Sequence, residues 1–266
     1  MITRSQAKLI RRLRSRKRRD EEEVFLLEGV RLLEELLASG WPVELAVTAP
    51  GLADTPRGRR LLESIRAAGW TEAEVSNAEL ERLADTETPQ GVLAVARRPG
   101  SRLAEFEPRG RAAVLVFDRL ADPGNLGTLV RAAHALGVAW AVALPGSVDA
   151  WNPKAVRASA GSLFHLPVSH EPWPEVVSWL RQREFAILCA DADGVPVPRR
   201  GVEQDRFALV LGNEHTGLAH EVRRECDGCV AVELPGDMDS LNVAIAGALL
   251  LDRLLAGPAE SPDGDT

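Results

Sequence analysis

Residues 233–255 read ELPGDMDSLNVAIAGALLLDRLL. The pattern predicts a final helix from about Leu241 to Leu255, apolar and rich in small residues. The N-terminal end of this helix is polar, with Asp237, Asp239, Ser240 and Asn242 within six positions. Asp239 or Ser240 can cap the helix, because a short oxygen-bearing side chain accepts hydrogen bonds from first-turn N–H groups. Capping leaves Asn242 and the preceding Gly236 unexplained, so the cluster indicates a further role.

Two other stretches have the same design: VFDRLADPGNLGTLVRAA at 116–133 and ALVLGNEHTGL at 208–218. In all three, an apolar strand ends in glycine and polar residues and leads toward a helix. Pro-Gly and Gly-Asn are also ordinary turn formers. Ligands of open α/β sheets bind at the carboxyl ends of strands, however, so three such turns in one domain predict one composite pocket.

Outward from these stretches, strands and helices alternate along most of the chain. A small α/β domain is predicted over residues 24–96, with helices closed by Gly40 and Gly69 and another capped by Asn77. The stretch RRPGSRLAEFEPRGR, rich in proline and glycine, predicts a linker. A second alternation starts at AAVLVFD, a continuous apolar run typical of a central parallel strand. It continues through the predicted strands AWAVAL, FAILCA, FALVLG and CVAVEL.

Composition limits the possibilities further. The 266 residues are 45% hydrophobic, enough for a substantial core, and contain no apolar run of membrane-spanning length. The N-terminus lacks the apolar core of a secretory signal. Three cysteines are too few for a disulfide framework, so a reducing cytoplasm fits best.

The first twenty residues hold nine of the 32 basic residues but only one of the 39 acidic ones. A basic arm on an acidic body indicates a polyanionic partner such as RNA. The stretch SQAKLIRRLRSRKRR can form a basic helix, with Leu9, Ile10 and Leu13 as its only apolar stripe. The alternative to RNA binding is that this helix is solvated and frayed. The candidate RNA-binding residues are Arg4, Lys8, Arg11, Arg12, Arg14, Arg16, Lys17, Arg18 and Arg19.

Several familiar sites are missing from the sequence. It has no G-x-G-x-x-G after a strand, no phosphate loop and no G-x-S-x-G nucleophile elbow. Cys226 and Cys229 have the spacing of a zinc-binding pair, but no second pair accompanies them, so no metal is expected.

The three stretches resemble the three motifs of the SpoU–TrmH family of RNA ribose methyltransferases. The first is DPGNLGTLVRAAHALG, with Asn125, Gly127 and Arg131; the second is GNEHTGL; the third is VELPGDMDSLNV. Glu233 departs from the family, which usually has proline there. GSVDAWNPKAVRASAGSLFHLPV also resembles the family, and FLLEGVRLLEELL and LADTETPQGVLAVA resemble its L30e-like substrate-binding domain.

The resemblance implies an α/β chain whose C-terminal parallel-sheet domain forms a trefoil knot. The expected organisation is an N-terminal RNA-binding domain at 1–97 with its basic arm at 1–20, a linker at 98–110, a methyltransferase domain at 111–256 and a disordered tail at 257–266. It also implies a homodimer in which Arg131 acts across the interface. Neither a membrane nor a metal is an expected partner.

S-adenosylmethionine is the implied cofactor, held by Leu211, Gly212, Val232, Leu234, Gly236 and Leu241. The implied catalytic residues are Arg131, Asn125, Glu214, Ser240 and Asn242. The expected reaction moves a methyl group to a ribose 2′-hydroxyl, in ribosomal RNA or, as the alternative substrate, transfer RNA. Two alternatives stay open: a non-catalytic RNA-binding or ribosome-assembly protein, and a base methyltransferase of the same knotted class.

Overall fold

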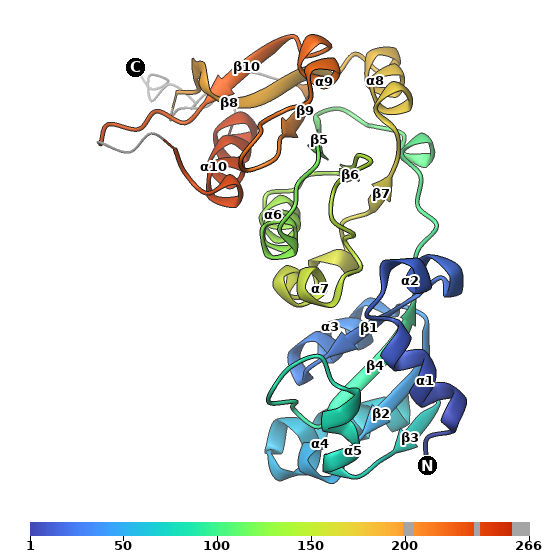
Figure 1. Cartoon of the computed structure of the whole chain (residues 1–266). Coiled ribbons are helices and arrows are strands. Elements are labelled where there is room, and N and C mark those ends of the chain that lie inside the picture. Colours follow the sequence, from blue (N-terminus) through green and yellow to red (C-terminus); the bar gives the residue numbers. More distant parts are fainter. Residues whose placement is uncertain (199–204, 237–239, 257–266) are drawn as a thin grey trace, which may run out of the picture. The chain divides into compact units, whose positions relative to one another are not determined.

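The computed structural model describes residues 1–198, 205–236 and 240–256 (Figure 1). The chain forms two compact units. Unit 1 combines Met1–Gly100 with the internal segment Asp149–His165, and unit 2 contains Ser101–Val148 and the chain from Leu166 onward. Residues 149–165, which resemble the methyltransferase family in sequence, thus pack with the N-terminal residues.

Unit 1 is built on a four-stranded sheet in the order β1-β4-β2-β3. Its central strand β4 runs antiparallel to β1 and β2, whereas β2 and β3 are parallel. The sheet is therefore mixed, and the short β3 is a strand that the sequence pattern did not reveal. The strands are β1 (Val24–Glu28), β2 (Val43–Thr48), β3 (Glu72–Glu74) and β4 (Val92–Arg97).

The predicted basic helix is two helices, because the chain turns at residues 13–15. The cap of the fifth helix is Ser76, whose side chain accepts a hydrogen bond from the Glu79 N–H, and not Asn77 as predicted. Helices of unit 1 are α1 (Arg4–Arg12), α2 (Arg16–Glu22), α3 (Val30–Ser39), α4 (Pro56–Ala67), α5 (Asn77–Leu83) and α7 (Pro153–Ser159), with 3-10 turns η1 (Pro50–Asp54) and η3 (Ser162–Phe164).

Helix α1 belongs to the core of unit 1. Ile10 and Leu13 are fully buried and pack with residues of β1, β2, β4 and α5. The frayed-helix alternative is therefore wrong, because the predicted apolar stripe is covered by the sheet rather than by solvent.

The internal segment 149–165 fills another part of this core. Trp151 is buried against Phe25 of β1, with ring centroids 4.6 Å apart. Trp41 lies between Trp151 and Phe164, at centroid distances of 6.3 and 5.6 Å. Unit 1 is thus completed by aromatic side chains from a distant part of the sequence.

Unit 2 confirms the predicted parallel α/β architecture. Its six-stranded sheet has the order β10-β8-β9-β5-β6-β7, and every neighbouring pair is parallel. The strands are β5 (Ala112–Phe117), β6 (Trp140–Ala143), β7 (Val168–His170), β8 (Ala186–Pro196), β9 (Arg206–Leu211) and β10 (Gly228–Ala231). Strand β7 was not predicted, and β10 is shorter than the CVAVEL stretch.

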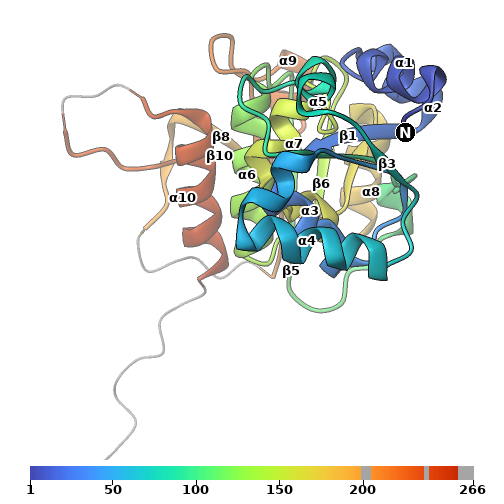
Figure 2. The same cartoon turned by 90° about the horizontal axis from the view of Figure 1, so that it is seen from below.

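Helices cover both faces of this sheet. Alternate residues of the strands pack with α8 and with Leu103, which lies in a 3-10 turn within the predicted linker. On the opposite face α10 lies beside α6 (Figures 1 and 2), and Gly247 of α10 approaches Leu129 and Leu211. The helices are α6 (Pro123–Ala135), α8 (Trp173–Gln182), α9 (His220–Arg224) and α10 (Val243–Leu255), and the turn is η2 (Leu103–Glu105).

Three expectations are not settled by this architecture. The tail at 257–266 lies outside the described residues, as do Asp237 and Asp239. The trefoil knot stays a prediction. Within the described part of the chain, none of the helices is long and apolar enough to cross a membrane.

Candidate active site

Three side chains, one from each motif, form a continuous chain of hydrogen bonds. The Asn125 side-chain amide donates to Glu214 Oε1 at 2.9 Å, and the Asn242 amide donates to Asn125 Oδ1 at 3.0 Å. Asn125 lies in the first turn of α6, Glu214 follows β9, and Asn242 precedes α10. The strand-end loops therefore converge, as the motif spacing predicts.

Glu214 also fixes the start of α6. Its carboxylate accepts hydrogen bonds from the N–H groups of Ala121 and Asp122 at 3.3 and 3.4 Å. Asp122 in turn caps the helix by accepting from the Asn125 N–H at 2.8 Å. Burial raises the pKa of Glu214, but the hydrogen bonds from Asn125 and from backbone N–H groups outweigh it, so the pKa lies below its ordinary value.

We expect Glu214→Gln to reduce the pH dependence of stability. Because the folded-state pKa of Glu214 is lowered, its carboxylate stabilises the fold above the ordinary value of 4.5. That contribution is lost as the pH falls through the lower folded-state pKa. In thermal unfolding, the melting temperature of the wild-type chain should exceed that of the variant most above about pH 5. The two melting temperatures should converge in acid. A gap between their melting temperatures that is constant with pH would contradict this role.

Asn242 is the cap of α10. Its Oδ1 accepts hydrogen bonds from the N–H groups of Ala244 and Ile245, at 2.9 and 3.4 Å, and the helix begins at Val243. The predicted start at about Leu241 is therefore two residues early, and Ser240 is not the cap. Ser240 is exposed and outside the hydrogen-bonded chain. One amide thus explains two features: Oδ1 caps a helix while Nδ2 joins the site.

The GNEHTGL loop is a tight structure supported by Asn213, which the sequence reasoning passed over. Asn213 Oδ1 accepts from the N–H groups of His215 and Thr216, both at 3.0 Å, and its backbone pairs with that of Gly217. A Cβ at Gly212 would lie 2.6–2.9 Å from backbone atoms of Gly217 and Leu218. Gly212 is therefore needed for the loop to close on itself. In the sequence, the asparagine directly after Gly212 indicates such a tight loop, because asparagine side chains bond to nearby backbone N–H groups in turns.

The candidate cofactor residues lie at the end of β9 and between β10 and α10. Leu211 is fully buried, and its carbonyl accepts from the Asp118 N–H, so it supports the sheet. Val232, Leu234 and Gly236 follow β10, and no described residue accepts a hydrogen bond from their N–H groups. A Cβ at Gly236 would meet no described atom within 4 Å. Backbone N–H groups that no described residue pairs with are suited to bind a ligand carboxylate or an adenine edge.

Arg131 stands apart from the hydrogen-bonded chain. It is exposed on α6, six residues after Asn125, which places the two side chains on different sides of the helix. Among the described residues it has no hydrogen-bond or ion-pair partner.

The nine basic residues of the arm fall into two groups. Arg4, Lys8, Arg11 and Arg12 lie on α1 and form no ion pair within the described part of the chain. The others contact acidic residues. Arg14 lies 3.9 Å from Asp85, and Lys17 lies 3.9 Å from Glu21. Arg16 pairs with Asp20, Arg18 with Glu21, and Arg19 with Asp149.

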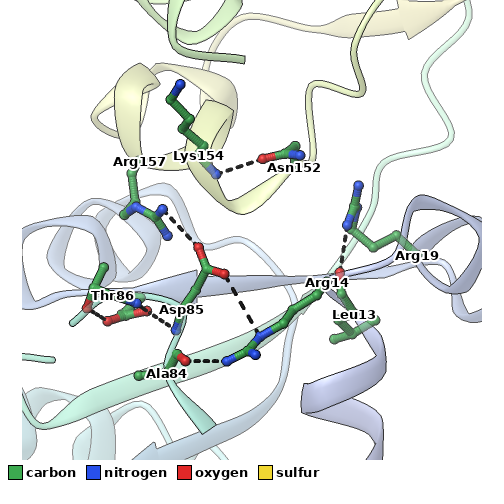
Figure 3. A network of polar contacts seen from close by, with 10 residues as sticks. Leu13, Arg14, Arg19, Ala84, Asp85, Thr86, Asn152, Lys154 and Arg157 are labelled. Atoms are coloured by element: carbon green, nitrogen blue, oxygen red, sulfur yellow. Dashed lines mark hydrogen bonds and ion pairs between the residues drawn. The ribbon is translucent and has the colours of Figure 1, made fainter. Parts of the chain in front are cut away.

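Asp85 joins the arm to α7 within unit 1 (Figure 3). Its carboxylate lies between Arg14 and Arg157, at 3.9 and 2.9 Å. Arg19 differs from the other arm residues because it is 1% exposed. Its Nε donates to Asp149 at 2.7 Å and its Nη1 to the Leu13 carbonyl at 2.6 Å. Arg19 is therefore part of the core and cannot reach an RNA phosphate from this position.

The cysteines do not form a zinc-type pair. Cys229 of β10 lies opposite Cys189 of β8 and is joined to it by a disulfide, which the sequence reasoning did not predict. Burial raises the pKa of Cys226 to about 11, and its thiol donates to the Val222 carbonyl. In the described ranges no three His, Cys, Asp or Glu residues gather as metal ligands.

Comparisons with known proteins agree with this geometry. Residues 112–252 match the SpoU rRNA methylase family, and residues 4–94 match an MRM3-like substrate-binding domain. The chain is 33% identical over 246 residues to the 23S rRNA (guanosine(2553)-2′-O)-methyltransferase RlmP of Bacillus subtilis, covering 92% of this chain and 93% of RlmP. It is 32% identical to a 23S rRNA (uridine(2479)-2′-O)-methyltransferase of Streptomyces viridochromogenes, covering 90% and 85%.

Solved structures of methyltransferases also superimpose on nearly the whole chain. The SpoU methyltransferase AviRb of Streptomyces viridochromogenes, in complex with AdoMet, superimposes with a TM-score of 0.85 and 29% identity, covering 95% of this chain and 97% of AviRb. The AdoMet-bound rRNA methyltransferase of Sinorhizobium meliloti has a TM-score of 0.81 and 28% identity, covering 94% of each chain.

These matches place the chain in the class of S-adenosylmethionine-dependent RNA 2′-O-methyltransferases. The chain belongs to the SpoU rRNA methylase family.

Proposed function

We propose that this enzyme methylates a ribose 2′-hydroxyl in ribosomal RNA. The names of RlmP and its Streptomyces relative support ribosomal RNA as the substrate. The observation that carries the proposal is the hydrogen-bonded chain Glu214–Asn125–Asn242, which joins all three motif loops. A cytoplasmic location would suit work on ribosomal RNA.

The two asparagines are suited to orient the acceptor. An amide NH₂ group has two donors, and Asn125 and Asn242 each use one of them within the chain of hydrogen bonds. Each therefore keeps one N–H for a ribose or phosphate oxygen. Because Glu214 holds Asn125 and α10 holds Asn242, these donors are fixed before RNA binds, which lowers the entropic cost of alignment.

S-adenosylmethionine supplies an activated methyl group, so the protein has to align the acceptor and assist loss of one proton. Val232, Leu234 and Gly236 would hold this cofactor through backbone N–H groups, together with Gly212 and Leu241. Arg131 would grip the phosphate beside the acceptor ribose. A guanidinium has a pKa above about 12 and is a poor base, whereas a bidentate contact to phosphate uses its geometry.

The α1 residues are the strongest candidates for RNA contact in unit 1. Arg4, Lys8 and Arg11 are exposed, and their spacing of four and three residues places them on one face of α1. They lack acidic partners in the described part of the chain, so phosphate binding would not have to break an existing ion pair. Such contacts give affinity that falls with salt and little sequence preference.

The active unit would be a homodimer formed partly through α10. Ile245 and Leu249 are 54% and 38% exposed, and four-residue spacing places them on one face of the helix. We expect Ile245→Asp to shift the protein to monomers in sedimentation velocity and to remove most methyl transfer. Val195→Asp, at an exposed apolar position of β8, is the matched control. An Ile245→Asp variant that stays dimeric would place the interface elsewhere.

The test of function uses the purified chain, tritiated S-adenosylmethionine and an unmodified 23S rRNA transcript. We expect label in the RNA and one nucleotide whose 3′-phosphodiester resists alkaline hydrolysis, as 2′-O-methylation requires. Label on an alkali-sensitive nucleotide would favour the base-methyltransferase alternative. Calorimetry separates the third possibility, because a folded protein that does not bind S-adenosylmethionine would be an assembly factor.

A further inference from the structure

Unit 2 contains a cleft that the residues proposed for the cofactor do not line. Its volume is about 800 Å³, within the range of sites that enclose a small ligand. The walls come from the loops after β5 and β6, the start of α8 and residues 216–225. Arg119 lies two residues before Ala121 and Thr216 two residues after Glu214, so the cleft and the active site share two loops.

The cleft walls favour a flat, uncharged group. Leu144, Trp173, Val177 and Leu218 supply apolar surface. Trp173 is 7% exposed, and its indole N–H is buried with no acceptor among the described residues. The carboxylates of Glu221 and Glu225 also line the cleft and would repel a phosphate from its interior.

Arg119 is held at this cleft in an unusual conformation. Its φ of 54° is left-handed, which is costly for a residue other than glycine. Asn213 Nδ2 donates to its carbonyl at 3.0 Å, and its Nη2 donates to the Gly217 carbonyl at 3.3 Å. Gly146, itself at φ 92°, leaves room for its side-chain stem, because a Cβ there would lie 3.0 Å from Arg119 Cγ. The surrounding loops thus place a guanidinium, 40% exposed, at the cleft, where its Nε lies 3.4 Å from the buried Asp118 carboxylate and its other edge remains open to a ligand.

We propose that this cleft binds one unpaired nucleobase of the substrate RNA, next in the chain to the methylated nucleotide, while Arg119 binds the phosphate between the two. The inference rests on the proposed function and extends it to how the target is chosen. Proteins read unpaired RNA bases by removing them from the stack and enclosing them against apolar and aromatic surface. The cleft and the Asn125–Asn242 site are connected directly, because Ala121, in the same loop as Arg119, donates to Glu214, which holds Asn125.

Two substitutions test this site. Val177→Trp fills the cleft, and Ser178→Trp places the same side chain at the next, exposed position of α8, which does not line the cleft. Arg119→Gly removes the guanidinium while accepting a positive φ, but it also removes the ion pair with the buried Asp118, so its KM is measured at a temperature at which the variant is fully folded. With the 23S rRNA transcript, we expect KM for RNA to rise about tenfold or more in Val177→Trp and Arg119→Gly, as loss of one base contact implies. Affinity for S-adenosylmethionine and KM in Ser178→Trp should not change.

Photocrosslinking gives an independent readout. A transcript containing 4-thiouridine and 6-thioguanosine should crosslink, through a base within one nucleotide of the methylated position, to peptides that include Trp173 or Thr216. Crosslinks elsewhere, or equal KM values in Val177→Trp and Ser178→Trp, would overturn the cleft assignment while methyl transfer by the wild-type chain upholds the function. No transfer to 23S rRNA by the wild type would refute the proposed function, and this inference with it.

Discussion

Arg131→Ala is expected to lower kcat by about 100-fold, because an acceptor ribose whose neighbouring phosphate is no longer held is misaligned with the methyl group. Its affinity for S-adenosylmethionine and its melting temperature should not change. Cofactor affinity and melting temperature should stay the same because Arg131 is exposed on α6 and has no partner among the described residues. Removing it therefore breaks no contact seen in the structure. Arg131→Lys should recover little activity, because an ammonium cannot reproduce a bidentate contact to phosphate. Retained turnover in Arg131→Ala would show that another residue has this role.

Complementation tests whether Arg131 acts across a dimer. Arg131→Ala and Asn125→Ala would each be inactive alone. If each site combines Asn125 of one protomer with Arg131 of the other, a mixed dimer of the two variants has one intact site and one doubly defective site. Co-expression should then restore activity. If both residues act within one protomer, neither site is intact and activity stays absent.

The convergence of the motif loops could be predicted because parallel strands carry their carboxyl ends to one edge of a sheet. Asn125, Glu214 and Asn242 were recognised as site residues, and the structure connects them by hydrogen bonds. The local sequence pattern does not predict the helix start correctly where one side chain both caps a helix and belongs to the site. Asn242 is both the cap of α10 and a member of the site, so reading it as a first-turn residue displaced the helix start.

Contacts between distant residues were out of reach of the sequence pattern. Nothing in residues 149–165 indicates that Trp151 packs on Phe25, because an apolar stretch does not specify its partner. The same holds for Cys189 and Cys229, whose proximity depends on the pairing of β8 with β10. Arg19 was grouped with the RNA-binding arm because charge along a sequence does not reveal burial.

The buried pair of Arg19 and Asp149 gives the largest expected effect on stability. Both side chains are nearly inaccessible, 2% and 3% exposed, and their charged atoms are 2.7 Å apart. Arg19→Met should lower the free energy of unfolding of unit 1 by about 3–5 kcal/mol, because it removes the guanidinium from a buried ion pair while the carboxylate stays buried. Lys17→Met, which breaks an exposed pair on the same helix, should cost under about 1 kcal/mol.

The double variant Arg19→Met/Asp149→Asn separates charge from packing. In the wild type, Asp149 accepts a hydrogen bond from the backbone N–H of Trp151 at 3.0 Å. Asparagine keeps an oxygen for this bond but removes the buried charge. It should therefore recover most of the stability lost in Arg19→Met. Urea unfolding followed by hydrogen exchange at β1, which packs on Trp151 through Phe25, reports on unit 1 separately from unit 2. If Arg19→Met matches the wild type, the residue is not held by Asp149, and its guanidinium would again be available to RNA.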